Sequence, residues 1–317
     1  MIARISGYVC CRALTVMPLV LATAVPGTGF AQPAPDPPAA PPITAQAPPG
    51  AVSGMGDINL YPKRVVIDDR HRVASVGVYN KTANSGDYDI TITDMLMTAD
   101  GRLVEPGSVS PDDPALARLH GAAAMIRWSP HRFTLGANEA QLVRIMARVS
   151  PDLPPGEYRT HMATIAVPPG DDGLTIADAA DRPQNANGIG VRITPRFGIS
   201  IPVIVRVGET SLSAGLQDLT LTTTPEGQKL IRLIVTRTGT RSAFGDITIT
   251  APGAPKPVAM VKGVGVYTEV DARVLSVAVD PALDARFTAS GTRLTATYVD
   301  DDHDPGKVLA KQDFVVP

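Results

Sequence analysis

The chain has 317 residues, 44% of them hydrophobic, and its 29 basic and 31 acidic residues nearly cancel to a net charge of −2. This length allows two domains, whereas the balanced charge and the pI near 6.2 exclude a strongly basic protein that binds nucleic acid through its charge. Aromatic residues make up only 4%, and the abundance of Val, Thr, Ile and Pro favours strands and turns over helices.

Residues 1–31 are typical of a secretory signal peptide. Two arginines lie close to an apolar run at residues 13–25, and Gly29-Phe30-Ala31 offers small residues at the −3 and −1 positions of a cleavage site. A membrane anchor is the alternative, but the run is short and Pro18 interrupts it. The segment therefore predicts export.

Both cysteines, Cys10 and Cys11, lie in this segment, ahead of its apolar core. We therefore expect a mature chain without a disulfide, without thiol chemistry and without a lipid-anchored cysteine. Residues 32–52 are rich in Pro and Ala and lack apolar periodicity, which predicts an extended tether.

Short alternating runs of apolar residues follow, separated by turn signals that contain Gly, Pro, Asn and Asp. We expect strands at residues 64–67, 73–79, 88–96, 142–149 and 158–167. Residues 112–124 are expected to form a short helix or a loop, and residues 168–188 a mobile hairpin loop.

A second series of short strands is expected after Gly208. It comprises residues 216–223, 230–236, 246–250, 264–270, 274–277, 293–299 and 308–315. Many short strands with Gly and Pro turns between them predict an all-β chain of β-sandwiches, one on each side of residue 208.

The most informative pattern is a period of two between Ile189 and Val207. Apolar or proline residues occupy every second position: Ile189, Val191, Ile193, Pro195, Phe197, Ile199, Ile201, Val203, Val205 and Val207. Such a period places all of them on one face of an extended strand. At ~3.3 Å per residue the strand would span roughly 60 Å, against the usual ~17–20 Å. We expect part of it to serve another chain, to join two domains, or both.

Several segments carry a resemblance to a known family. They are YPKRVVI at residues 61–67, WSPHRFTLGANEAQLVRI at 128–145, LPPGEYRTH at 153–161 and ISIPVIVR at 199–206, with a weaker match, YVDD, at 298–301. In this order they resemble the periplasmic chaperones of pilus and fimbrial assembly (the PapD-like family), and especially its archaic, or alternative, branch.

The resemblance implies two immunoglobulin-like β-sandwich domains in an angled, L- or boomerang-shaped arrangement. Residues 53–207 would form the N-terminal chaperone domain and residues 208–317 the C-terminal domain. The family binds pilus or fimbrial subunits in the periplasm, completes each subunit's sandwich by donating a strand, and delivers it to an outer-membrane usher. Such donation is a case of β-strand addition.

The donor strand implied by the resemblance includes Val191, Ile193, Phe197, Ile199 and Ile201. Their side chains would insert into a groove of the subunit. The alternative is an interior strand of the chain's own sandwich, in which the same side chains belong to its own core. Pro195, nearby in the sequence, suits an edge strand better than a central one.

The family holds the subunit's terminal carboxylate with a cleft arginine, a role that the resemblance gives to Arg64. A guanidinium grips a carboxylate with two parallel hydrogen bonds. The family's partner lysine is replaced by Pro202 here, so Arg64 acts alone, or Arg196 or Arg144 substitutes, or the terminus is held differently. The alternative for Arg64 is a surface arginine, and the neighbouring Lys63 leaves the register open by one residue.

Glu157, Arg206 and Asp301 match a family salt-bridge network at the domain junction. Asp300 or Asp302 is an alternative to Asp301, and three unrelated solvated charges are the alternative to a network.

The acidic run at residues 300–304 could suggest a site for calcium or a transition metal, but no glycine-spaced loop frames it, which favours a solvated turn. No metal-ligand spacing of histidines, no Gly-x-Ser-x-Gly elbow and no phosphate-binding glycine loop occurs. We therefore expect no enzyme, no cofactor, no metal and no nucleotide, and no nucleic-acid partner.

The main competing hypothesis is a secreted immunoglobulin-like adhesin or structural module of a surface appendage. A secreted hydrolase with an accessory sandwich finds no support in the spacing of its serines, histidines or carboxylates. Self-association of the unloaded protein, the identity of the subunit and the identity of the appendage stay open.

Overall fold

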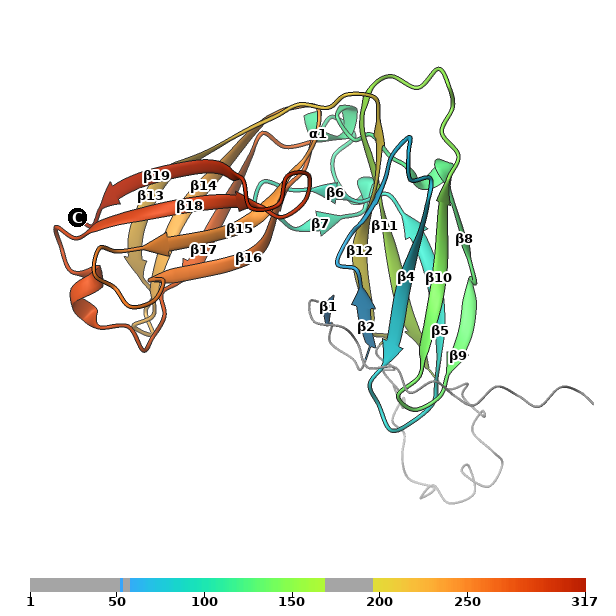
Figure 1. Cartoon of the computed structure of the whole chain (residues 1–317), viewed down its shortest axis with the longest axis horizontal. Helices are drawn as coiled ribbons and strands as arrows, with labels where there is room; N and C mark the ends of the chain where they lie inside the picture. The colour runs from blue at the N-terminus through green and yellow to red at the C-terminus, as the bar shows by residue number, and fades with distance from the viewer. Residues whose placement is uncertain (1–51, 54–57, 169–195) are drawn as a thin grey trace, which may run out of the picture. The chain divides into compact units, whose positions relative to one another are not determined.

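Two β-sandwiches make up the part of the chain that the computed structural model describes, namely residues 52–53, 58–168 and 196–317 (Figure 1). The all-β fold class expected from the sequence is therefore confirmed. The expected signal peptide, the loop beyond Pro168 and the first part of the long strand, up to Pro195, lie outside the described residues.

The first sandwich consists of two five-stranded sheets, with strand orders β1-β2-β4-β10-β8 and β3-β12-β11-β5-β9. The strands of the first sheet, in that order, are Val52–Ser53, Ile58–Tyr61, Val73–Asn80, Ala140–Ala147 and Ile126–Ser129. Those of the second are Val65–Ile67, Gly198–Val207, Gly156–Val167, Gly86–Thr93 and Arg132–Leu135.

The core of this sandwich follows from the alternation of apolar residues along its strands. On β10, Val143 and Ile145 are fully buried, whereas Leu142 is 65% exposed on the opposite face. On β12, Ile201 and Val203 join the same core cluster. A period of two in the sequence thus becomes one face that packs against the opposite sheet.

The chain passes from one sheet to the other between β2 and β3. β2 pairs antiparallel with β4 in the first sheet, whereas β3 pairs parallel with β12 in the second. Residues 62–64 join them in an irregular bend. The sequence predicted a strand at residues 64–67 but missed β2, and the bend between the strands positions Lys63 and Arg64.

The second sandwich consists of a three-stranded sheet, β13-β14-β17, and a four-stranded sheet, β16-β15-β18-β19. The strands of the first are Leu212–Thr223, Lys229–Gly239 and Ala272–Ala278. Those of the second are Ala259–Val266, Ala243–Thr250, Arg293–Asp300 and Val308–Val315. The strand expected at 264–270 was placed too late, because β16 ends at Val266.

Between β5 and β8 the chain forms a hairpin and short helical turns. The hairpin strands are β6, Leu96–Met97, and β7, Leu103–Val104. The helix α1 spans Pro114–Ala117, and short 3-10 turns span Pro106–Ser108, Ala123–Met125 and, in the second sandwich, Ala285–Thr288. The hairpin is tied to the second sandwich, because the backbone N–H of Val274 donates to the carbonyl of Ala99 at 2.9 Å.

Candidate functional site

The edge of β12 is the first feature of the site. β12 pairs with β11 along its whole length, from Val207 opposite Gly156 to Gly198 opposite Ile165. On its other edge it pairs with β3 only at residues 203–205. Residues 198–202 therefore have a neighbouring strand on one side only, among the residues that the structure describes.

Backbone alternation indicates which groups this edge presents. The carbonyl of Phe197 accepts a hydrogen bond from the N–H of Ala166, so residue 197 points its backbone polar groups toward β11. In an antiparallel pair the residues alternate, so Gly198 and Ser200 direct their N–H and C=O groups to the open side. Pro202 presents only a carbonyl there, because proline has no N–H.

The predicted donor side chains divide into three groups. Val191 and Ile193 lie outside the described residues. Phe197 is 41% exposed, whereas Ile199 and Ile201 are only 8% and 1% exposed. The latter two belong to the core of the first sandwich. Their assignment as side chains that insert into a subunit is therefore corrected: from residue 199 onward, the apolar face of β12 already packs against its own opposite sheet.

Arg64 emerges from the bend between β2 and β3 with its guanidinium almost fully buried. Its two terminal nitrogens donate to the same carboxylate oxygen of Asp301 at 2.8 and 2.7 Å. The guanidinium also lies 4.4 Å from the centre of the Phe244 ring, a favourable cation–π geometry. Asp301 additionally accepts a hydrogen bond from Lys63.

These contacts set the charge of Asp301. Burial by itself would raise the pKa of the Asp301 carboxyl, but the hydrogen bonds from Lys63 and Arg64, together with their positive charge, lower it below its usual range. Asp301 is therefore ionised at neutral pH and neutralises Arg64. A carboxylate from another molecule has to compete with Asp301 for this guanidinium.

Arg196 does not join Arg64, contrary to the two-residue anchor considered from the sequence. Its side chain is 57% exposed and lies 3.9 Å from Asp89 on β5. Val203 is the residue of β12 that lies beside β3, at Val65. Seven residues of extended chain separate Arg196 from that point, roughly 20 Å at ~3.3 Å per residue. Arg144, the other substitute, is exposed on β10 in the opposite sheet.

The junction network matches the expected residue types, with a shift of one position. Arg206 donates to Glu157 at 3.2 Å and to Asp302, not to Asp301. Burial alone would lower the pKa of Arg206, but the charges of Asp302 and Glu157 raise it. Glu157 also accepts hydrogen bonds from the backbone N–H and the hydroxyl of Ser242. One ion network thus links β11 and β12 to the second sandwich.

A second buried network is formed by residues to which the sequence motifs assign no role. Arg159 on β11 pairs with Glu269, and its guanidinium stacks 3.7 Å from the centre of the Tyr267 ring. Glu269 also accepts a hydrogen bond from the backbone N–H of Met97 at 2.8 Å. The signal was the run of Glu157, Arg159 and His161 at alternate positions of β11, which places three polar side chains on one face of the strand.

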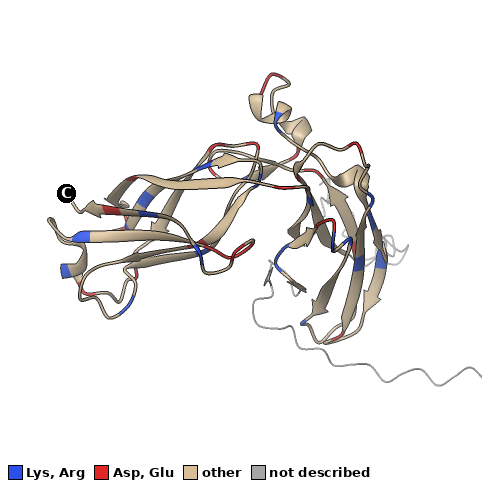
Figure 2. Ribbon diagram, turned by 45° about the horizontal axis from the view of Figure 1, so that its top comes forward, with Lys and Arg blue, Asp and Glu red and all other residues tan. Residues whose placement is uncertain are grey.

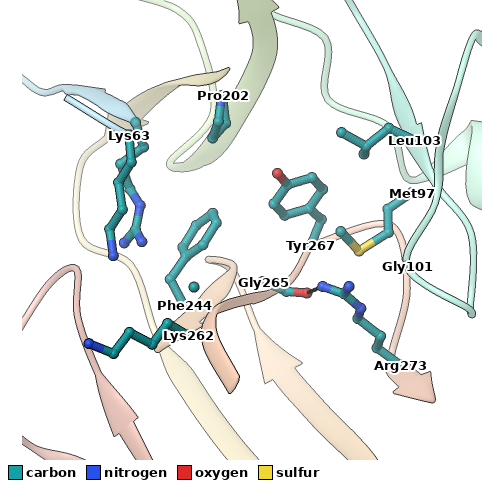
Figure 3. A pocket seen from close by; sticks show the side chains of 12 residues that line it. Lys63, Met97, Gly101, Leu103, Pro202, Phe244, Lys262, Gly265, Tyr267 and Arg273 are labelled. Carbon is teal, nitrogen blue, oxygen red and sulfur yellow. Dashed lines mark hydrogen bonds between the residues drawn. The ribbon is translucent and has the colours of Figure 1, made fainter. Parts of the chain in front are cut away.

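A cavity of 520 Å³ lies next to these networks. We call it the cationic pocket, because Lys63, Arg64, Lys262 and Arg273 line it and no acidic side chain does. Its apolar wall includes Phe244 and Tyr267, which lie between Lys63 on one side and Arg273 on the other in Figure 3. Along the described ribbon as a whole, acidic and basic residues are interspersed (Figure 2).

The part of the chain that the structure describes offers no group of three or more His, Cys, Asp or Glu side chains suited to a metal ion. The acidic run is a turn in which Asp300 accepts hydrogen bonds from the backbone N–H groups of Asp302 and Asp304. Within the same described ranges no helix combines the length and apolar character needed to cross a membrane.

Comparison of the sequence with known proteins finds no match: no protein-family model matches the chain, and no curated protein does.

Comparison with solved structures finds chaperones of the kind that the sequence motifs resemble. The CupB2 chaperone of Pseudomonas aeruginosa is 13% identical, over 81% of this chain and 100% of its own, with a TM-score of 0.40. The Escherichia coli chaperone DraB is 14% identical, over 82% of this chain and 96% of its own, also with a TM-score of 0.40.

A third match is the structure of the CsuC–CsuE chaperone–tip adhesion subunit pre-assembly complex, from the archaic chaperone-usher Csu pili of Acinetobacter baumannii. The matched chain of that structure is 12% identical, over 84% of this chain and 98% of its own length, with a TM-score of 0.38. The function of this chain is therefore inferred from its own residues.

Proposed function

We propose that this protein is a periplasmic chaperone of pilus or fimbrial subunits. It binds a subunit that lacks one strand, completes the subunit's sandwich with its own chain, and delivers the subunit to an outer-membrane usher. Binding is the whole function, and no covalent bond is made or broken. The proposal rests on the sequence motifs, on the open edge of β12 and on the cationic pocket.

The observation that carries the proposal is the one-sided pairing of residues 198–202. A subunit strand placed along this edge can bond to the backbone groups of Gly198 and Ser200 and to the carbonyl of Pro202. Strand addition of this kind draws its affinity from main-chain hydrogen bonds and its specificity from alternate side chains.

Apolar side chains preceding this edge would supply the rest of the affinity. Phe197 is 41% exposed, and Ile193 and Val191 continue its period of two toward the N-terminus. Burial of each such side chain contributes ~1.5–3 kcal/mol before ordering costs are subtracted. The three together would contribute on the order of 5–9 kcal/mol, enough to hold an exposed subunit core.

The cationic pocket would receive the subunit's terminal carboxylate. Arg64 is the proposed anchor, as the family resemblance implies. In the free protein the carboxylate of Asp301 is hydrogen-bonded to the Arg64 guanidinium. Binding of a subunit would therefore exchange one carboxylate for another at the same guanidinium, so the charge of Arg64 stays neutralised before and after capture.

Co-expression with a pilin from the same gene neighbourhood tests the proposal. We expect the two proteins to purify as a one-to-one complex, and we expect Arg64→Ala to abolish capture while the far-UV circular dichroism of the chaperone is unchanged. Arg132→Ala, an exposed arginine of β9, is the matched control. Purification of this protein as a monomer, without any of the co-expressed pilins, would contradict the chaperone function and favour an adhesin or structural module.

A further inference from the structure

Arg273 is the one member of the cationic pocket that is substantially buried and forms no ion pair among the described residues, although the charge of Asp100 acts on it from nearby. Its terminal nitrogen donates to the carbonyl of Gly265 at 2.7 Å, and its Nε is buried without a hydrogen-bond partner. Arg64, by contrast, is held by Asp301. A guanidinium that has already lost much of its water and faces a cavity attracts an anion strongly.

The Arg273 guanidinium fits closely against the backbone of the β6–β7 hairpin. The guanidinium lies against Gly101, in the turn between β6 and β7, where a Cβ atom would lie only 2.0 Å from the Arg273 Nε. Gly101 also has a φ of +83°, which favours glycine. Any side chain at residue 101 would displace the guanidinium, so the position of Arg273 depends on glycine at residue 101.

Apolar groups surround this end of the pocket. Met97, Leu103 and Tyr267 line the pocket together with Arg273 (Figure 3), whereas Lys63 lies at the opposite side of the view. An anion that carries an apolar group would therefore be favoured over a strongly hydrated inorganic one, because the apolar group gains burial as the charge is paired.

We propose that Arg273 is a second carboxylate-binding residue of the pocket, distinct from Arg64, and that its ligand is a peptide carboxylate next to an apolar side chain. The carboxylate comes either from a chain terminus or from an acidic side chain of the bound subunit. This inference deepens the proposed chaperone function, on which it rests for the identity of its natural ligand, but the binding chemistry can be tested without a subunit.

Small peptide mimics provide the test on the full-length mature protein. N-acetyl-phenylalanine supplies a terminal carboxylate next to an apolar side chain, N-acetyl-aspartyl-phenylalaninamide supplies a side-chain carboxylate next to the same apolar group, and N-acetyl-phenylalaninamide supplies the apolar group without a carboxylate. The readout is the Nε–Hε resonance of Arg273 in nitrogen-15 spectra, assigned by its loss in Arg273→Lys. We expect a saturable shift with one or both acids and none with the amide. The acid that binds more tightly identifies the source of the carboxylate.

Two variants separate a local site from a general effect of charge. Arg273→Gln should weaken binding of the effective acid by about tenfold, since a charge-assisted pair is lost. Arg232→Gln removes the same charge from an exposed position on β14, the strand next to β17, and should change binding by less than about twofold. Thermal melts establish that both variants are folded. If Arg273→Gln does not fold, the titration of the unaltered protein decides alone.

The absence of a saturable shift with either acid, or equal shifts with the acids and the amide, would overturn the Arg273 site. That result would leave subunit capture untouched, because capture is measured separately by co-purification. Conversely, a protein that binds the acids but captures no pilin would retain the Arg273 site and contradict the proposed function.

Discussion

At the scale of single residues, Asp301 and Asp302 show how neighbours in the sequence acquire separate tasks. Asp301 pairs with Arg64 and Lys63, whereas Asp302 pairs with Arg206 and lies 3.7 Å from Arg64. Both lie in the turn after β18, where Asp301 makes the closer contacts with the bend between β2 and β3 and Asp302 makes the closer contact with β12. Asp301 therefore neutralises the proposed anchor, Arg64, and Asp302 contributes to the ion network at the junction of the two sandwiches.

Asp301→Asn should leave Arg64 with only its longer contact to Asp302, at 3.7 Å, and so make it more available to a subunit. While Asp301 occupies Arg64, only the fraction of molecules with a free Arg64 can bind a subunit, which weakens the apparent affinity for the subunit. We therefore expect the variant to bind a labelled pilin roughly tenfold more tightly, as measured by titration. Asp304→Asn is the control, because Asp304 lies in the same turn but pairs with Lys307 at 3.3 Å. Weaker capture by Asp301→Asn would show that Asp301 supports the anchor and does not compete with it.

His161 makes the stability of the protein sensitive to pH. Burial, followed by the charge of Arg159, lowers its pKa from 6.5 to about 3. Between these values the unfolded chain binds a proton at residue 161 and the folded chain does not, so the free energy of unfolding decreases as the pH falls below 6.5. The slope is at most ~1.4 kcal/mol per pH unit.

His161→Phe should remove this dependence. Both ring nitrogens of His161 lack a hydrogen-bond partner among the described residues, so phenylalanine leaves no polar group unpaired. We expect the unaltered protein to lose about 2 kcal/mol more than the variant between pH 7 and pH 5 in urea unfolding. Parallel losses in the two proteins would mean that His161 is protonated in the folded state.

At the scale of elements, β12 has two functions along its length. Its first residues offer an open edge, whereas residues 203–205 are paired on both edges, with β11 and β3. Ile204 is buried on the face opposite to the first core, in a small cluster with Met97, Phe244 and Tyr267. The strand thus begins as an edge and ends as a central strand that contacts the second sandwich.

Substitutions along β12 should separate these functions. Phe197→Asp should abolish subunit capture and change the free energy of unfolding by less than about 0.5 kcal/mol, because the side chain is exposed. Ile201→Asp places a charge in the core and should cost several kcal/mol, roughly 3 or more. Urea unfolding and co-purification measure the two effects. Equal destabilisation by both would place Phe197 in the protein's own core.

The sequence predicted β12 as an alternating strand but could not say what covers each of its faces. A period of two identifies one apolar face and leaves open whether the chain's own sheet or a guest lies against it. Ile199 and Ile201 have the same signature as Phe197, yet only Phe197 is exposed. The difference depends on how far the opposite sheet extends, which is a tertiary property.

The site shows the same limit. The motifs located Arg64, Glu157 and Arg206, because each lies in a recognisable segment. They could not assign Asp302 over Asp301, since a shift of one residue exchanges two identical side chains. Glu269 lies 110 residues from Arg159, and no local pattern marks it as the partner of a buried arginine.

At the scale of the whole molecule, ion pairs between the two sandwiches differ in burial. The side chains of Arg159 and Glu269 are 3% and 0% exposed, whereas those of Arg118 and Asp271, which pair at 2.5 Å, are 41% and 67% exposed. A buried pair is costly to break because the remaining charge stays out of water. An exposed pair contributes only ~0–1 kcal/mol.

Glu269→Gln and Asp271→Asn should therefore differ strongly. The first leaves Arg159 buried without a counter-charge and should lower the free energy of unfolding by about 3 kcal/mol. The second should lower it by less than about 1 kcal/mol. Urea unfolding at pH 7 and moderate salt measures both. Similar values for the two variants would mean that water reaches Arg159 in the folded protein.

Strand addition at the open edge of β12 can be measured directly by amide hydrogen exchange along β12, in the free protein and in a complex with a captured pilin. We expect the N–H groups of Gly198 and Ser200 to exchange rapidly in the free protein and to become strongly protected in the complex, while those of residues 203–205 stay protected in both. Unchanged exchange at Gly198 and Ser200 in a one-to-one complex would contradict strand addition at this edge.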